Sequence, residues 1–412
     1  MLISLSSHNV IQYLQEAGLC SSEEGVSADS ELPQSSKKNS NLLVTLRGNR
    51  KLLVKQERHL HNNETPHEFF NEWLFHQLLE RFPTLGSISA IASLVVHFDA
   101  KKSILVRNYL KEYLDVASIY QKNLSFPREI ASAIGTCVGT LHRATFNRQE
   151  YRDFMATAPE GQYRYQFYNP AQGIGSIGPE IVGTVPTNAL KFYALYQRYE
   201  ILEGAIAELS YEWKPCCLTH NELKLDNILV HSKWDRLDNC LVRLIDWEAC
   251  SWGDPAFDLG NLLASYLAIG LESLVEDPTL ELEEALHLAT VPLETLQPSI
   301  LALTQAYLDT FSTILEYRSD FLFRTIQFAG LVLLHRIEDN IKQHKYFDNS
   351  GISMFQVAKS LLTKPQESVI TIFGLSETEI LKPFVKMAKI SQEKKEPNLV
   401  RFYHTKTQLR GC

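Results

Sequence analysis

The chain of 412 residues is long enough for two lobes or domains, each with its own hydrophobic core. Its 45% hydrophobic and 21% charged residues are ordinary for a globular protein, and no apolar run is long enough to span a bilayer. The net charge of −8 argues against nucleic acid as a partner, because phosphate backbones attract basic surfaces.

The N-terminal part is predicted as a small sheet with helices. The first residues lack the basic region of a signal peptide, so we expect a cytoplasmic protein with no membrane partner. In chain order we expect a helix over 8–18, a polar linker over 21–41, strands over 42–46 and 52–54, a helix over 66–82, and strands over 94–98 and 103–109. This pattern is typical of an antiparallel sheet packed by one helix.

After about residue 110 the pattern changes to long helical periods. We expect helices over 128–145 and 187–209, a Gly- and Pro-rich insertion near 159–186, a compact strand-loop-strand block over 216–246, and mainly helices to about residue 390. The fold class is therefore α+β, with a smaller part at 1–107 and a larger, mainly helical part at 108–412.

Polar residues gather in the compact block. The segments LTHNELKLDNILV (218–230) and LVRLIDWE (241–248) each place a polar loop against an apolar strand. We expect Glu222, Asn227 and Asp246 to meet at the mouth of a cleft. Phosphoryl transfer needs two such parts. One is a carboxylate that orients the acceptor hydroxyl, and the other is a set of oxygen ligands that bind Mg²⁺.

Three segments in order, HNELKLDN (220–227), IDWE (245–248) and GDPAFDL (253–259), resemble the aminoglycoside phosphotransferase and choline kinase superfamily. Its typical motifs are HGDxxxxN, IDW or IDF, and GDPxxDLA. The resemblance implies a two-lobed, protein-kinase-like fold that uses ATP and Mg²⁺. It implies that Asn227 and Asp246 bind the metal, that His220 braces the catalytic loop, and that Asp258 holds the backbone of that loop.

The resemblance extends upstream and covers most of the chain from Asn9 to about Asn340. Strand LLVKQE (52–57) implies that Lys55 reaches the nucleotide phosphates, with Glu72 as its ion-pair partner. The segment ILVRNYL (104–110) resembles the interlobe hinge, so the backbone at Asn108 and Tyr109 is expected to receive adenine. Residues 1–107 would then be the nucleotide-binding lobe.

Two departures from the family pattern bear on activity. Glu222 occupies the position of the catalytic base, where Asp is usual, and its extra methylene moves the carboxylate by roughly 1 to 1.5 Å. A shift of that size lowers rates by roughly a hundredfold. The segment SSKKNSN (35–41), where the family has its nucleotide loop, contains no glycine.

Three hypotheses therefore stay open for the acceptor. The first is a small hydroxylated metabolite or an aminoglycoside-like molecule. The second is a peptide Ser or Thr. The stretch THNELKLDNIL (219–229), with Asn221 where the superfamily usually has Gly, resembles the kinase component of some lanthipeptide systems, which work with a partner lyase. The third is a pseudokinase that binds nucleotide or a protein partner without phosphoryl transfer. Lys224 is either a surface charge or a group near the transferred phosphate, and His142 is expected to be a core histidine.

Overall fold

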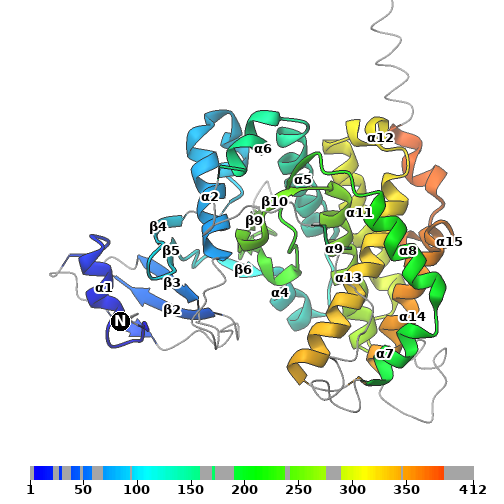
Figure 1. Ribbon diagram of the computed structural model, residues 1–412, viewed down its shortest axis with the longest axis horizontal. Helices are drawn as coiled ribbons and strands as arrows, with labels where there is room; N and C mark the ends of the chain where they lie inside the picture. Colours follow the sequence, from blue (N-terminus) through cyan, green and yellow to red (C-terminus); the bar gives the residue numbers. More distant parts are fainter. Residues whose placement is uncertain are drawn as a thin grey trace, which may run out of the picture.

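The computed structural model places a small sheet at one end of the molecule and a large helical body at the other (Figure 1). It describes residues 4–21, 27–29, 39–46, 50–57, 68–92, 95–157, 169–171, 190–236, 242–274, 289–344 and 347–384. Most of the segment between the first two expected strands, almost all of the expected insertion near 159–186, and most of the linker lie outside these residues. Within them, no helix is both long and apolar enough to cross a bilayer.

The N-terminal sheet is antiparallel, with strand order β1-β2-β3-β5-β4. The strands are β1 (Ser27–Asp29), β2 (Asn39–Thr45), β3 (Lys51–Glu57), β4 (Val95–Asp99) and β5 (Ile104–Asn108). Alternate residues of β3 point to opposite faces. Leu52 and Val54 pack under helix α1 (Val10–Glu16) in a small core, which leaves Lys55 on the opposite face.

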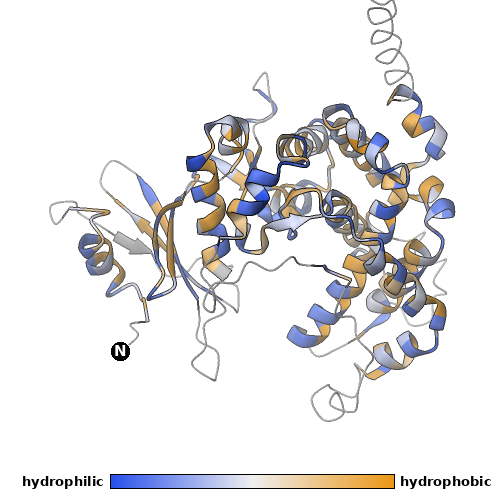
Figure 2. Cartoon of the chain, turned by 45° about the horizontal axis from the view of Figure 1, so that its top comes forward, coloured by the Kyte–Doolittle hydropathy of each residue, from blue (hydrophilic) through white to orange (hydrophobic). Residues whose placement is uncertain are grey.

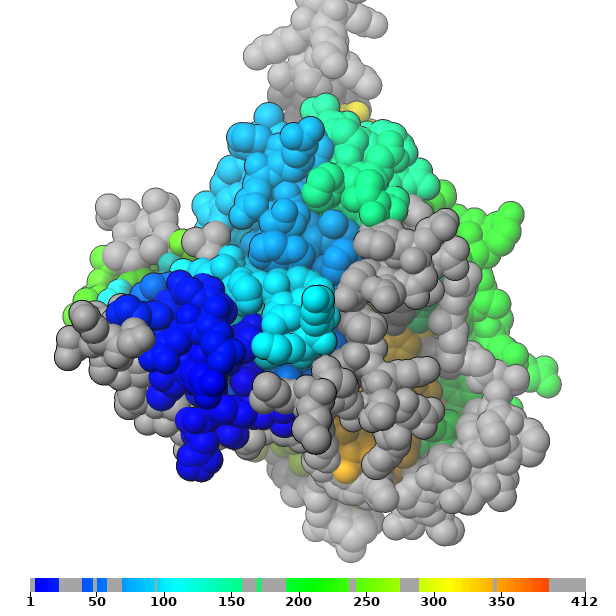
Figure 3. All heavy atoms as spheres, turned by 60° about the vertical axis from the view of Figure 1, so that its left-hand side comes forward, coloured from blue at the N-terminus to red at the C-terminus, as the bar shows by residue number. Residues whose placement is uncertain are grey.

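Helix α2 (Glu68–Arg81) connects the sheet to the helical body. At its start, the Phe69 amide donates to the Glu57 carboxylate at the end of β3, 2.9 Å away, which satisfies a free helix-end donor. The apolar residues of α2, such as Phe75, belong to the core of the helical body and not to the small core under α1. Farther along, α2 lies against α6 (Gln149–Met155) (Figure 3). Phe82, just after α2, contacts Tyr151 of α6 edge to face. A parallel bridge between Ala92 and Leu244 adds a further connection.

Two small sheets carry the polar loops of the larger part. Strand β6 (Tyr113–Asp115) pairs with β8 (Ile228–His231), which pairs with β9 (Val242–Leu244). Strand β7 (Cys217–Thr219) pairs with β10 (Ser251–Gly253). The short 3₁₀ turn η4 (Leu225–Asn227) directly precedes β8, and η5 (Trp247–Ala249) lies between β9 and β10.

Helices make up the rest of the body, and their apolar sides turn inward (Figure 2). Helix α9 is buried on nearly all sides and lies between α5, α11 and α13. The helices are α4 (Val116–Asn123), α5 (Arg128–Thr145), α7 (Leu190–Gln197), α8 (Glu200–Tyr211), α9 (Pro255–Glu272), α11 (Leu293–Thr310), α12 (Thr313–Tyr317), α13 (Phe321–His344), α14 (Asn349–Thr363) and α15 (Pro365–Phe373).

The α+β class is confirmed, with one helix corrected. The single helix expected over 187–209 is two helices, because Tyr199 leaves the helical conformation with φ −116° and ψ 78°. Its ring contacts Phe355 of α14 and lies under the ammonium of Lys359. The N-terminal sheet ends at Asn108, next to the expected boundary at 107/108, although α2 shares the larger core.

Candidate active site

The loop after β7 is held by a buried carboxylate at the start of α9. The Asp258 carboxylate accepts hydrogen bonds from the His220 and Asn221 amides, both at 2.7 Å. His142 of α5 lies 3.1 Å from the same carboxylate, and its other ring nitrogen lies 2.9 Å from the Tyr307 hydroxyl. Asp258 therefore makes the backbone contacts expected of it, and His142 is a core histidine that supports it.

His220 joins the loop to the strand that precedes Asp246. Its Nε2 lies 2.9 Å from the Ile245 carbonyl oxygen, and its ring packs against Trp247 at a centroid distance of 4.6 Å. The imidazole is fully buried, so it has no access to a substrate. The bracing role expected of His220 agrees with these contacts.

Asn221 has the left-handed backbone conformation that most side chains avoid, with φ 64°. Asn tolerates this conformation better than most residues, since its short polar side chain bonds locally. The Asn221 amide group donates to the Ala249 carbonyl at 2.8 Å and to the Ser251 hydroxyl at 2.7 Å. Asn in place of the family's Gly therefore keeps the loop conformation and ties the loop to the segment after Asp246.

Glu222 lies at the surface end of the loop. Its carboxylate, 39% exposed, accepts a hydrogen bond from the Lys224 ammonium at 2.9 Å. The Asn227 amide group donates to the Glu222 carbonyl at 2.9 Å, and the Asn227 carbonyl accepts from the Ile245 amide at 3.0 Å. These bonds place Asn227 beside the strand that leads to Asp246, and its Oδ1 is left as an acceptor.

Lys55 contacts other carboxylates than the one expected. Its ammonium donates to Asp246 Oδ1 at 3.0 Å and to Glu248 Oε1, not to Glu72. The buried Arg107 of β5 also donates to Asp246 Oδ1, at 3.0 Å, and lies 3.9 Å from Glu72. The expected Lys55–Glu72 ion pair is thus wrong for this structure, because two nearer carboxylates compete for the ammonium.

Burial and close charges shift the pKa values of this network. Burial would lower the pKa of Lys55, but the Asp246 and Glu248 carboxylates raise it above its usual range. Burial alone would raise the pKa of Asp246, but Lys55 and Arg107 hold it well below its usual range. For Glu248, burial raises the pKa to about 7, because its effect exceeds the lowering by the positive charge of Lys55. Burial also raises the pKa of Glu72.

The same carboxylates are the groups that suit a divalent cation. One oxygen each from Glu72, Asp246 and Glu248 lie within 4.8 Å of one another. Asp246 has φ 63°, a strained conformation that turns the chain between β9 and η5 and brings Glu248 back toward the cluster. Sequence reasoning assigned no role to Glu248 or Arg107. The signals available were a second carboxylate in IDWE and an arginine inside an apolar strand.

The expected hinge residues are placed at the end of β5. Asn108 pairs with Leu52 in the last rung of the β3–β5 ladder. The Tyr109 amide already donates to the Lys51 carbonyl at 2.9 Å, and its carbonyl accepts from the Lys111 amide at 3.2 Å. The Tyr109 amide is thus used within the chain, whereas its carbonyl oxygen keeps a second lone pair. The adenine contact stays a prediction for the backbone at Asn108 and Tyr109.

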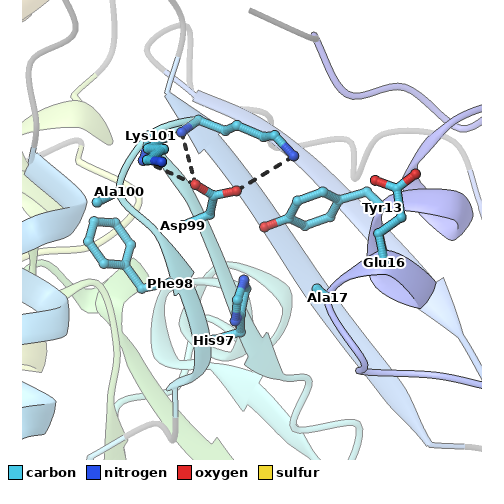
Figure 4. Close-up of a pocket in the computed structure, with 9 residues that line it drawn as sticks. Tyr13, Glu16, Ala17, His97, Phe98, Asp99, Ala100 and Lys101 are labelled. Carbon is cyan, nitrogen blue, oxygen red and sulfur yellow. Dashed lines mark hydrogen bonds and ion pairs between the residues drawn. The ribbon is translucent and has the colours of Figure 1, made fainter.

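A separate hollow of about 460 Å³ lies away from this network, between α1 and the β4–β5 hairpin. Tyr13, His97 and Asp99 point toward one another across it (Figure 4). Burial, and then the Asp99 charge, raise the pKa of Tyr13 above its usual range. None of the residues expected in the active site lines this hollow.

A protein-family model and several solved structures match this chain. The model of the phosphotransferase enzyme family matches residues 32–277, which is more than half of the chain and includes the segments with Lys55, Glu222 and Asp246. No curated protein matches. Among solved structures, the choline kinase LicA from Streptococcus pneumoniae is 16% identical, with a TM-score of 0.45 over 86% of this chain and 99% of that one.

Two further solved structures are similar to a comparable degree. A choline/ethanolamine kinase family protein from Mesorhizobium loti is 12% identical, with a TM-score of 0.44 over 90% of this chain and 100% of that one. The ADP-bound aminoglycoside phosphotransferase APH(2'')-Ib is 13% identical, with a TM-score of 0.44 over 90% of this chain and 99% of that one. By the extent of the family match, the chain belongs to the phosphotransferase enzyme family.

Proposed function

We propose that this chain is an ATP- and Mg²⁺-dependent O-phosphotransferase for a hydroxyl-bearing acceptor. One observation carries the proposal: the ammonium of Lys55, in β3, contacts the carboxylate of Asp246, 191 positions later in the chain. This contact lies beside the loop that presents Glu222. A cation from the sheet and carboxylates from the helical body thus share one site. Phosphoryl transfer relies on such positioned charges more than on covalent chemistry.

Four groups would hold the donor side. Lys55 is buried and charged, and it would pair with nucleotide phosphates after leaving its carboxylate partners. Asp246, Asn227 and Glu248 offer the hard oxygen ligands that Mg²⁺ prefers, and the bound ion would offset charge on the transferred group. The donor set fits such an ion, since both oxygens of the neighbouring Glu72 are buried without a hydrogen-bond partner in the described part of the chain.

Glu222 would act on the acceptor side. Its partial exposure at the end of a loop held by Asp258 and His220 lets a carboxylate meet a hydroxyl from outside. There it would orient the hydroxyl and accept its proton during in-line attack. Lys224, bound to that carboxylate, would have to move aside or turn toward the transferred phosphate.

Nucleotide binding tests the proposal most directly. We expect ATP with Mg²⁺ to raise the melting temperature of the purified chain more than ATP alone does. Asp246→Asn should remove the Mg²⁺-dependent part, because it deletes a charge from the proposed metal site. Asp235→Asn, at an exposed position, is the matched control. No shift with millimolar ATP, or a full Mg²⁺ effect in Asp246→Asn, would contradict the proposed donor site.

A binding function without transfer is the second candidate. It is favoured by the ion pair between Glu222 and Lys224, which occupies the carboxylate proposed as the base. Nucleotide binding without ATP hydrolysis or transfer to any acceptor would support this candidate. Transfer to aminoglycosides or other small alcohols, or to a Ser/Thr peptide in the presence of a lyase, would exclude it. The peptide acceptor and the partner lyase remain predictions from the sequence.

A further inference from the structure

A buried arginine lies within the N-terminal sheet, on the face that carries Lys55. Arg107 belongs to β5, whose sequence ILVRN is otherwise apolar until its last residue, and only 7% of Arg107 is exposed. It pairs with Leu53 of β3, two positions from Lys55, so both cations point from the same side of the sheet. A buried guanidinium is costly unless carboxylates surround it.

Two carboxylates do surround Arg107. Its NH1 donates to Asp246 Oδ1 at 3.0 Å and lies 3.9 Å from Glu72 Oε1. Glu72 is fully buried, and its oxygens have no hydrogen-bond partner in the described part of the chain. Lys55, meanwhile, is bound to Asp246 and Glu248. Arg107 is therefore the cation within ion-pair distance of Glu72 and the second cation on Asp246.

We infer that Arg107 is a positioning residue of the phosphotransferase site, which holds Asp246 and compensates Glu72 so that Lys55 is free to engage the nucleotide phosphates. The inference rests on the proposed function. If Lys55 moves to the phosphates, Arg107 is the one cation among the described residues that stays within ion-pair distance of Asp246 and Glu72. A guanidinium suits this task because its planar fork carries five donors and stays charged.

Without Arg107, the balance of Lys55 between its carboxylate partners and the nucleotide phosphates would change. Lys55 would be the nearest remaining cation for the carboxylates of Glu72, Asp246 and Glu248, all of which interact with its charge. Those carboxylates would then hold the ammonium more tightly, and the phosphates would compete for it less well. Removing the charge of Glu72 should relieve this competition. The effect of Glu72→Gln on nucleotide binding should therefore change sign with the residue at position 107.

Calorimetric titration with ATP at several Mg²⁺ concentrations tests this inference. We expect Arg107→Met to weaken ATP binding at least tenfold and to raise the Mg²⁺ concentration needed for half-maximal binding. Arg107→Lys should recover part of the loss. Glu72→Gln should weaken binding or leave it unchanged in the wild-type background, but strengthen it in the Arg107→Met background. Arg81→Met, at an exposed position of α2, is the control and should bind ATP as the wild type does.

The outcomes separate this inference from the proposed function. If the wild type binds ATP but Arg107→Met binds it equally well with the same Mg²⁺ dependence, the inference fails and the proposed function stands. Equal losses from Glu72→Gln in both backgrounds would also overturn it, because they indicate a merely structural role. If Arg107→Met does not fold, Arg107→Gln, which also removes the charge, gives the same sign test with and without Glu72→Gln. A wild type that binds no ATP would overturn both.

Discussion

Asn221 shows how one residue satisfies the backbone and the packing of the loop together. At φ 64°, Gly costs nothing in strain, Asn costs little, and Ala costs about 1 to 2 kcal/mol. Asn221→Gly should lose only the bonds to Ala249 and Ser251, whereas Asn221→Ala should also add strain. We expect Asn221→Ala to be less stable than Asn221→Gly by about 1 kcal/mol in urea denaturation. The reverse order would contradict the conformation described.

His76 makes folding sensitive to acid. Burial, and then the charge of Arg107, lower the pKa of this imidazole from 6.5 to about 4. Between pH 6.5 and about pH 4, His76 binds a proton in the unfolded chain but not in the folded chain. The free energy of unfolding therefore falls as the pH falls through this range. We expect His76 to account for a loss of about 1.4 kcal/mol between about pH 7.5 and pH 5.5.

The contribution of His76 can be separated from that of other groups. His76→Gln should show a shallower decrease in the free energy of unfolding with acid than the wild type, measured by urea denaturation at both pH values. His8→Gln changes an exposed histidine and should keep the wild-type slope. An equal slope in the wild type and in His76→Gln would indicate that the pKa of His76 is the same in the folded and the unfolded chain.

At the scale of elements, the packing of α5 against α11 depends on a glycine. A Cβ added to Gly135 of α5 would lie 2.1 Å from the Leu303 carbonyl oxygen of α11, which is backbone and has little freedom to move. We expect Gly135→Ala to destabilise the chain by about 3 kcal/mol, because the two helices must separate. A fall in the melting temperature measures this cost.

Helix α8 offers a matched control for that substitution. A Cβ on Gly204 would meet nothing within 4 Å, and Ala is the better helix former. Gly204→Ala should therefore stabilise the chain by about 0.5 to 1 kcal/mol. If both substitutions lowered the melting temperature equally, close packing of α5 on α11 would not explain the result at Gly135.

The sequence predicted elements well where a single periodic pattern decides the structure. The helix over 128–145 has the bounds of α5, and the strand expected to carry Lys55, LLVKQE (52–57), lies within β3. The break at Tyr199 was missed because it depends on a contact with α14, which lies far along the chain. Strand β6 has three residues and exists by pairing with β8, so no local pattern marks it.

In the candidate site, too, local contacts could be predicted from the sequence and long-range contacts could not. The contacts of Asp258 and His220 with the loop could be expected, because they lie within or beside one short motif block. The partners of Lys55 depend on how the sheet sits over α2 and η5, which no local spacing encodes. The competition among Glu72, Asp246 and Glu248 for two cations was therefore not predictable from the motifs, and neither was the place of Arg107.

At the scale of the whole molecule, the two cores differ in size and should differ in stability. The core under α1 is small, whereas the core of the helical body includes α2 and continues through α9 and α13. Local opening with a small loss of buried surface is cheaper than global unfolding. The sheet that carries Lys55 should therefore open before the helical body does.

Hydrogen exchange of single-core variants tests this order. Leu14→Ala removes a fully buried side chain from the small core, at a cost of about 2 to 5 kcal/mol. We expect faster exchange for amides of β2, β3 and β5, and unchanged exchange for amides of α9 and α13. Leu262→Ala, in α9, should accelerate exchange in the helical body. Because Lys55 lies on β3, Leu14→Ala should also weaken ATP binding while the helical body stays folded. Equal acceleration everywhere in Leu14→Ala would show instead that the two cores unfold as one unit.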